Sequence, residues 1–178
     1  MANTNDPNGF TPAYHMTGGT IRPAQMRIAS ATNASIFSGD VVNLSSGYII
    51  QGTATGAPIG VFAGVYYEAT DGTPTFSKHW TADVATLGSA DAKAYIYNDP
   101  DIVYEAQFTA GTPAVSFIGN KYTLSTTAGS TSTGRSAEGV TATTSSGVAL
   151  CVGFVDTPSN SIAAYARAYF RFPANPFE

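Results

Sequence analysis

Few residues of this chain belong to the types that perform chemistry in proteins. The chain has two histidines, His15 and His79, and one cysteine, Cys151. Neither histidine has another histidine, a cysteine or a carboxylate at the spacing of a metal site, so the sequence predicts no metal centre. Cys151 lies in the apolar run of residues 148–155, where a buried thiol acts as a small hydrophobic group. A single cysteine also excludes an intramolecular disulfide.

The carboxylates offer two weaker possibilities. Asp101 and Glu105 could form the acid and base pair of a glycoside hydrolase, but spacing alone does not place them together. The turn of residues 98–101 could give oxygens to calcium, but it lacks the ligand spacing of a calcium loop. The chain contains neither G-x-S-x-G nor a phosphate-binding glycine loop. We therefore predict a protein that is not an enzyme and has no catalytic residue, cofactor or metal.

The composition indicates a surface that is covered by neighbours. Charged residues make up 11% of the chain, against roughly 25% in ordinary soluble domains. So few charges would leave the surface of a lone monomer poorly solvated, which predicts self-association. The net charge of −4 without a basic run argues against nucleic-acid binding. No signal-like start and no long apolar run is present, so we expect no membrane partner and synthesis in the cytoplasm.

The strand signals predict an all-β fold, a small β-barrel or jelly-roll-like sandwich with extended terminal arms. Residues 38–69 give the clearest pattern, a hairpin followed by a long strand in which Gly60 and Gly64 mark bulges, bends or a close backbone crossing. Asp71-Gly72 predicts a second hairpin, in which Phe76 and Trp80 share a face. Further strands are expected at residues 93–97 and 102–108, which should pair as neighbours, and at 148–155 and 162–172.

The chain divides by composition into an arm, a β-domain and a tail. Residues 1–20 lack any hydrophobic period and are expected to form an extended arm that lies on a neighbouring subunit or partner. Residues 21–172 form the β-domain, and residues 173–178 a proline-stiffened tail. Within the domain, the Ser/Thr/Gly-rich residues 125–147 exceed an ordinary connection, so this loop is either ordered by a partner or mobile.

The last strand supplies the best candidate contact surface. Its residues alternate, and the face that carries tyrosine and arginine has the residue types enriched at the centres of protein interfaces. A solvated outer face is the alternative interpretation. Aromatic residues in the arm and the tail are further candidates. The candidate contacts with other subunits or with a partner surface are Phe10, Tyr14, Tyr165, Arg167, Tyr169, Arg171 and Phe177.

Several stretches together resemble the capsid cement, or decoration, proteins of short-tailed bacteriophages. They are residues 16–22 (MTGGTIR), 38–42 (SGDVV), 59–65 (IGVFAGV) and 97–107 (YNDPDIVYEAQ). These are strand and turn patterns rather than a catalytic signature, and residues 125–147 match no pattern of this family. The resemblance implies a β-barrel or jelly-roll-like unit on the outer surface of the phage head, commonly a trimer or dimer, that stabilises the shell formed by the major capsid protein.

We therefore expect a virion protein that self-associates, with a homotrimer favoured and a dimer possible, and that binds the major capsid protein. Multiple weak contacts in an array would give such a protein its affinity. Two other functions fit the sequence. One is a jelly-roll protein that forms a shell by itself. The other is a carbohydrate- or receptor-binding β-module, with Tyr66, Tyr67, Trp80 and Tyr95 as the residues that stack on sugars.

Overall fold

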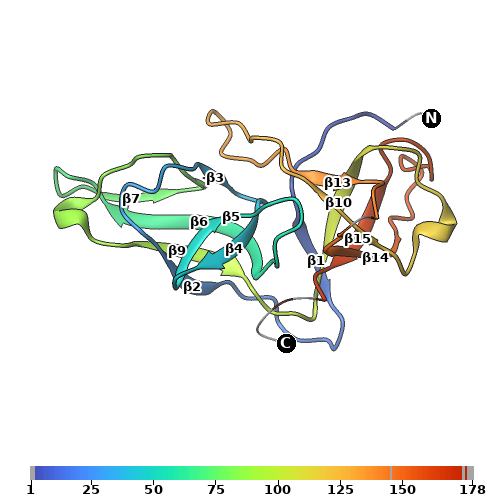
Figure 1. Ribbon diagram of the computed structural model, residues 1–178, viewed down its shortest axis with the longest axis horizontal. Coiled ribbons are helices and arrows are strands. Elements are labelled where there is room, and N and C mark those ends of the chain that lie inside the picture. Colours follow the sequence, from blue (N-terminus) through green and yellow to red (C-terminus); the bar gives the residue numbers. More distant parts are fainter. Residues whose placement is uncertain (1–2, 145, 174, 176–178) are drawn as a thin grey trace.

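The computed structural model describes residues 3–144, 146–173 and 175. Among these residues, the regular elements are β-strands and two short 3₁₀ helices, η1 (Leu87–Ser89) and η2 (Val115–Phe117). The molecule is elongated, with two β-lobes side by side along its long axis (Figure 1). The expectation of an all-β fold is confirmed. None of the helices in this part of the chain has the length and apolarity needed to cross a membrane.

The first lobe, here called the barrel lobe, is a nearly closed sheet. Its strands follow the order β2-β9-β6-β4-β5, β7 pairs with the far end of β6, and β2 also contacts β5. Phe62, Trp80 and Ile96 are among the apolar side chains that fill its centre. The strands are β2 (Ala24–Ile28), β3 (Ile36–Phe37), β4 (Val41–Ser45), β5 (Tyr48–Gln51), β6 (Gly60–Glu68), β7 (Pro74–Ser77), β8 (His79–Trp80) and β9 (Ala92–Tyr97).

The second lobe, here called the sheet lobe, is built from both ends of the chain. Its strands follow the order β11-β14-β15-β10-β13-β12, and β1 pairs with the start of β10. A separate core that includes Tyr104, Phe108 and Phe170 lies beneath this sheet. The strands are β1 (Thr11–His15), β10 (Ile102–Ala110), β11 (Lys121–Tyr122), β12 (Leu124–Ser125), β13 (Gly139–Thr141), β14 (Ala149–Phe154) and β15 (Arg167–Arg171).

The hairpin of β4 and β5 and the glycines of the following strand β6 have the structure that the sequence predicted. Ser46 and Gly47, at φ 50° and 86°, connect β4 to β5 in a two-residue turn whose backbone twist suits a hairpin. A Cβ at Gly60 would collide with the carbonyl oxygen of Tyr97 on β9. The pairing of β6 with β9 shifts register between Phe62 and Gly64, which is the predicted bulge.

Two predictions about strand pairing are wrong. Phe76 and Trp80 do not share a face, because the strand breaks at Lys78; Phe76 is 75% exposed, whereas Trp80 is fully buried. The strands before and after residues 98–101 do not pair with each other. Instead β9 pairs with β2 and β6, and β10 pairs with β1, β13 and β15, so residues 98–101 carry the chain from one lobe to the other.

The expected N-terminal arm lies on its own chain rather than on a neighbour. The Phe10 side chain is 1% exposed and packs against Phe170 and Phe172 in the core of the sheet lobe. The next residues form β1, which pairs antiparallel with β10. The backbone N–H of Asp6 also donates to the side-chain oxygen of Gln107. Phe10 is therefore a core residue and not a subunit contact.

The Ser/Thr/Gly-rich segment is ordered by the barrel lobe. We call residues 126–138 the strap. The backbone N–H of Ser38 donates to the carbonyl of Gly134, and the N–H of Ser136 donates to the carbonyl of Ser38, both at 3.0 Å. A Cβ at Gly129 would collide with the Phe37 ring, which explains the small residue there. In Figure 1 the strap reaches from β13 of the sheet lobe toward the barrel lobe. Neither a partner nor mobility is needed to account for its sequence.

Candidate functional site

The outer face of the sheet lobe presents the alternating residues of β15. Ala168 and Phe170 point into the core and are fully buried, while Arg167, Tyr169 and Arg171 point outward and are partly exposed. The alternation begins later than the sequence predicted. Tyr165 lies in a turn with φ 60°, and Ala164 lies in the same turn and is exposed.

Two polar contacts fix the start of β15. Asn160 accepts from the backbone N–H of Arg167 at 2.8 Å, and its side-chain amide donates to the carbonyl of the same residue at 2.9 Å. The Arg167 guanidinium donates to the Glu105 carboxylate on β10 at 3.0 Å. Both side chains of this ion pair keep substantial exposure, 42% for Arg167 and 30% for Glu105. The two carboxylates considered as an acid and base pair therefore have different partners. Glu105 pairs with Arg167, whereas Asp101 hydrogen-bonds Thr17 and Asp99.

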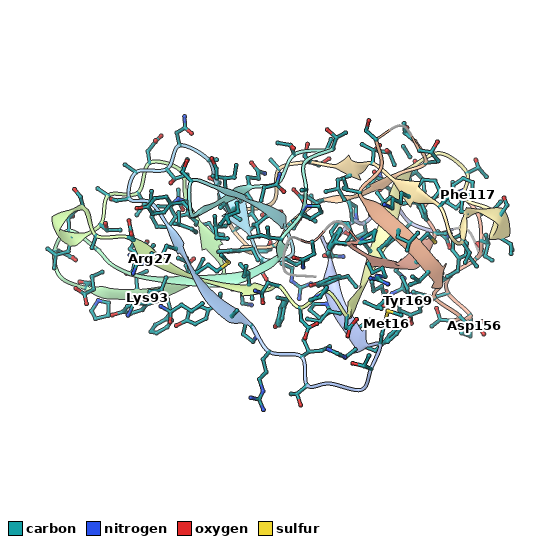
Figure 2. The ribbon with its side chains drawn as sticks, turned by 60° about the horizontal axis from the view of Figure 1, so that its bottom comes forward. Met16, Arg27, Lys93, Phe117, Asp156 and Tyr169 are labelled. Carbon is teal, nitrogen blue, oxygen red and sulfur yellow. The ribbon has the colours of Figure 1, made fainter. Side chains whose placement is uncertain are left out.

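Aromatic residues extend this face onto β1. The rings of Tyr14 and Tyr169 meet edge to face, with centroids 5.5 Å apart, and Tyr14 is 45% exposed. Met16, just beyond β1, is 51% exposed and lies on the same side as Tyr169 (Figure 2). We call Tyr14, Met16, Arg167, Tyr169 and Arg171 the outer patch. The fold therefore brings Tyr14 together with three candidates from β15. Tyr165 lies in the turn before them, and Phe177 lies outside the described residues.

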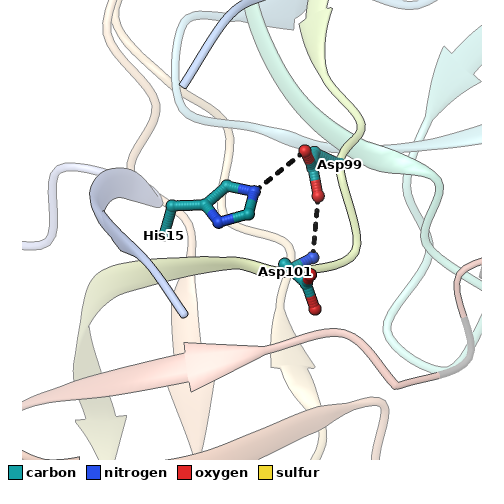
Figure 3. Close-up of side chains that lie close together, drawn as sticks. All are labelled: His15, Asp99 and Asp101. Atoms are coloured by element: carbon teal, nitrogen blue, oxygen red, sulfur yellow. Dashed lines mark hydrogen bonds and ion pairs between the residues drawn. The ribbon is translucent and has the colours of Figure 1, made fainter. Parts of the chain in front are cut away.

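A histidine and two aspartates meet where the lobes join, which the sequence did not predict. His15 ends β1, while Asp99 and Asp101 lie in the connection from β9 to β10, and their ligand atoms are all within 4.8 Å of one another (Figure 3). The imidazole Nε2 lies 3.0 Å from Asp99 Oδ2. The pairing of His15 with Ile102 brings these groups together, since it places the end of β1 beside the start of β10.

The hydrogen bonds of His15 do not suit a metal ligand. Its Nδ1 accepts from the backbone N–H groups of Thr17 at 3.3 Å and Gly19 at 3.1 Å. We therefore assign the ring proton to Nε2, from which it is donated to Asp99. A metal-binding histidine instead donates its second N–H to an acceptor, and here that nitrogen faces two donors. Both ring nitrogens are thus occupied by the protein itself.

The same cluster contains the elements of a nucleophile triad. Thr17 Oγ1 lies 3.1 Å from His15 Nδ1, and Asp99 lies on the other ring nitrogen. However, the lone pair of Nδ1 already accepts two backbone N–H groups, and Thr17 also donates to Asp101 at 3.4 Å. None of the hollows described on this chain is lined by His15 or Thr17. The geometry fits a clasp that closes the turn after β1.

Electrostatics supports the structural role of this clasp. The backbone N–H of Asp101 donates to Asp99 Oδ1 at 2.9 Å, and this bond lowers the pKa of Asp99, with a further contribution from His15. A Cβ at Gly19 would collide with the imidazole, so the glycine lets the chain close around His15. The signal available in the sequence was the Thr17-Gly18-Gly19 run, which begins two residues after His15.

Cys151 and one of the sugar-stacking candidates, Trp80, are too buried to reach a ligand. Burial raises the pKa of Cys151 to about 11, so the thiol remains protonated near neutral pH. Trp80 is fully buried and meets Tyr67 edge to face inside the barrel lobe. Tyr66 packs against Phe76 with ring centroids 4.7 Å apart, and the Lys93 ammonium lies 5.5 Å from its centroid.

Comparison with known proteins does not add to this description. No family model matches the chain, and neither a curated protein nor a solved structure matches it.

Proposed function

We propose that this chain is a capsid cement protein that binds the outer surface of a phage head and stabilises the shell. It would act as a homo-oligomer, with a trimer favoured over a dimer, and its partner would be the major capsid protein. The observation that carries the proposal is the outer patch. Tyrosine and arginine are enriched in interface centres, and here they lie together on a broad sheet face.

The rest of the surface supports a protein that is covered by neighbours. Exposed apolar side chains occur on both lobes, with Phe76 at 75% on the barrel lobe and Val115 at 65% on the sheet lobe. Charged residues are 11% of the chain, so little of the surface is strongly hydrated. Many weak contacts of this kind, repeated over a shell, give tight attachment through effective concentration.

The test is binding to heads that lack this protein. Heads assembled from the proposed partner, a major capsid protein, without this chain would be mixed with the purified full chain and sedimented. Wild-type chain should co-sediment and raise the temperature at which the heads release their contents. Tyr169→Ala and Arg171→Ala should each weaken binding about tenfold or more. The matched change Arg27→Ala, on β2 of the barrel lobe with a side chain that is 73% exposed, should leave binding unchanged. Assembly of the chain alone into shells would instead support a self-assembling shell protein.

A carbohydrate-binding module is the second candidate, and one hollow favours it. This hollow is bordered by two tyrosines, two carboxylates and a lysine, which are residue types that bind sugars. Its volume is about 190 Å³, and it lies on the barrel lobe away from the outer patch. Micromolar binding on a glycan array that is lost in Tyr66→Ala would favour this function over the cement function. The residues in question are Tyr66, Tyr67, Glu68, Asp91 and Lys93.

A further inference from the structure

Two carboxyl groups are buried where the strap meets the barrel lobe. Asp40 directly precedes β4 of the barrel lobe, and Glu138 is the last residue of the strap. Both are 0% exposed. The N-terminal segment closes over them, since the N–H of Gly9 donates to the carbonyl of Glu138 and the N–H of Phe10 donates to that of Gly39. The outer patch and the His15 clasp involve neither carboxyl.

Each carboxyl has one oxygen with a partner and one without. Asp40 Oδ2 accepts from the N–H of Phe37 and Glu138 Oε2 accepts from the N–H of Val41, both at 2.8 Å. The other two oxygens, Asp40 Oδ1 and Glu138 Oε1, are buried and have no hydrogen-bond partner among the described residues. Ser136 lies beside both groups, because its hydroxyl accepts from the N–H of Glu138 and its presence lowers the pKa of Asp40, which opposes the effect of burial.

Two ionised carboxylates in this position would be strongly unfavourable. A buried charge without a counter-charge costs several kcal/mol, and two like charges side by side add repulsion to that cost. One proton removes the repulsion and one of the two buried charges, and it turns one carboxylate into an O–H donor beside oxygens that lack a donor. We propose that Asp40 and Glu138 hold one proton between them, and that losing it loosens the strap from the barrel lobe.

The surrounding groups do not provide another counter-charge. The titratable and charged side chains on the adjoining elements are Asp6 of the N-terminal segment, Lys78 just before β8, His79 in β8, and Arg135 of the strap. In the described part of the chain, none of these has a hydrogen bond or ion pair to either carboxyl.

A bound cation is also disfavoured. The hollows beside this junction are lined by Asn8, Gly39 and Arg135, among others, and do not reach either carboxyl. The proton is therefore the neutralising species that fits the space.

The direction of the pH effect follows from the burial. Burial raises the pKa of Asp40 to about 6, and burial together with the charge of Asp40 raises the pKa of Glu138 to about 9. The ordinary values are 3.8 and 4.5. Between the ordinary and the raised values the folded chain binds more protons than the unfolded chain. Its free energy of unfolding therefore falls as pH rises through this window and is greatest on the acid side.

The experiment is thermal unfolding of the full chain across this window, with Trp80 fluorescence as the readout. The melting temperature of wild type should fall by about 5 °C or more between about pH 6 and about pH 9.5. Glu138→Gln keeps an acceptor for Val41 and supplies an N–H₂ donor that no longer titrates, so its melting temperature should stay nearly level. Asp156→Asn, a matched change at an exposed acid, should retain the wild-type slope.

Three results would overturn the proposal. They are a level wild-type profile, a Glu138→Gln profile with the wild-type slope, or a slope that disappears with EDTA and returns with Ca²⁺. If Glu138→Gln does not fold, the proposal is tested instead by amide hydrogen exchange of the wild-type chain. The amides of Ser38 and Ser136 should lose protection between pH 6 and pH 9.5 while those of β6 keep it, and equal protection at both pH values would contradict a proton-held strap.

Discussion

Replacing Phe10 by alanine tests whether the N-terminal segment belongs to the fold of its own chain. The Phe10 ring is 1% exposed, and its centroid lies 6.2 Å from that of Phe170 and 5.4 Å from that of Phe172. Burying a phenylalanine contributes about 1.5–3 kcal/mol. The cavity left by truncation raises the total cost to about 3–5 kcal/mol. Phe10→Ala should therefore lower the free energy of unfolding by that amount.

The assay is equilibrium denaturation in urea at two protein concentrations about a hundredfold apart. The matched control is Phe76→Ala, which removes a ring that is 75% exposed and should change stability by less than about 0.5 kcal/mol. The loss in Phe10→Ala should be the same at both concentrations, because the contact lies within one chain. A cost below about 1 kcal/mol, or a loss that depends on concentration, would show that the segment is bound elsewhere and would refute this reasoning.

Three further outcomes are expected. Gly60→Ala should destabilise the chain by about 2 kcal/mol or more in urea denaturation, because the added Cβ meets the Tyr97 carbonyl; an unchanged midpoint would contradict that close approach. Cys151 should react with a thiol reagent only under unfolding conditions, since it is buried with a raised pKa; rapid labelling of native chain would disprove this. Asp99→Asn should lower stability by about 1–2 kcal/mol at neutral pH, and the difference from wild type should shrink below about pH 4, because the lowered pKa means that native Asp99 loses its charge only in acid. A constant difference on acidification would argue against the clasp.

The sequence predicted the features that depend on neighbouring residues. The Ser46-Gly47 turn allows only a tight hairpin, and the glycines of the long strand require a bulge or a close crossing. The alternation along the last strand also identified which face is buried, because a period of two is a local property.

The sequence could not predict features that depend on distant pairing. Whether Phe10 enters a core or a partner depends on β1 reaching β10, about ninety residues away, and no local pattern encodes this. The same pairing places Asp99 beside His15. Trp80 was assigned to the wrong face because a strand break at Lys78 reverses the period. The sequence did not predict where the strap lies, because its small residues are required by contacts with the barrel lobe that are distant in the sequence.

The barrel lobe is, in topological terms, an insertion into a hairpin. Because His15 and Ile102 are direct partners across the β1 and β10 pair, the chain leaves the sheet lobe and returns to it at adjacent points. A short turn would be enough to join these two residues, whereas the barrel lobe occupies the whole excursion between them. Such an arrangement allows the excursion to be exchanged for another module while the face that carries Tyr169 keeps its framework.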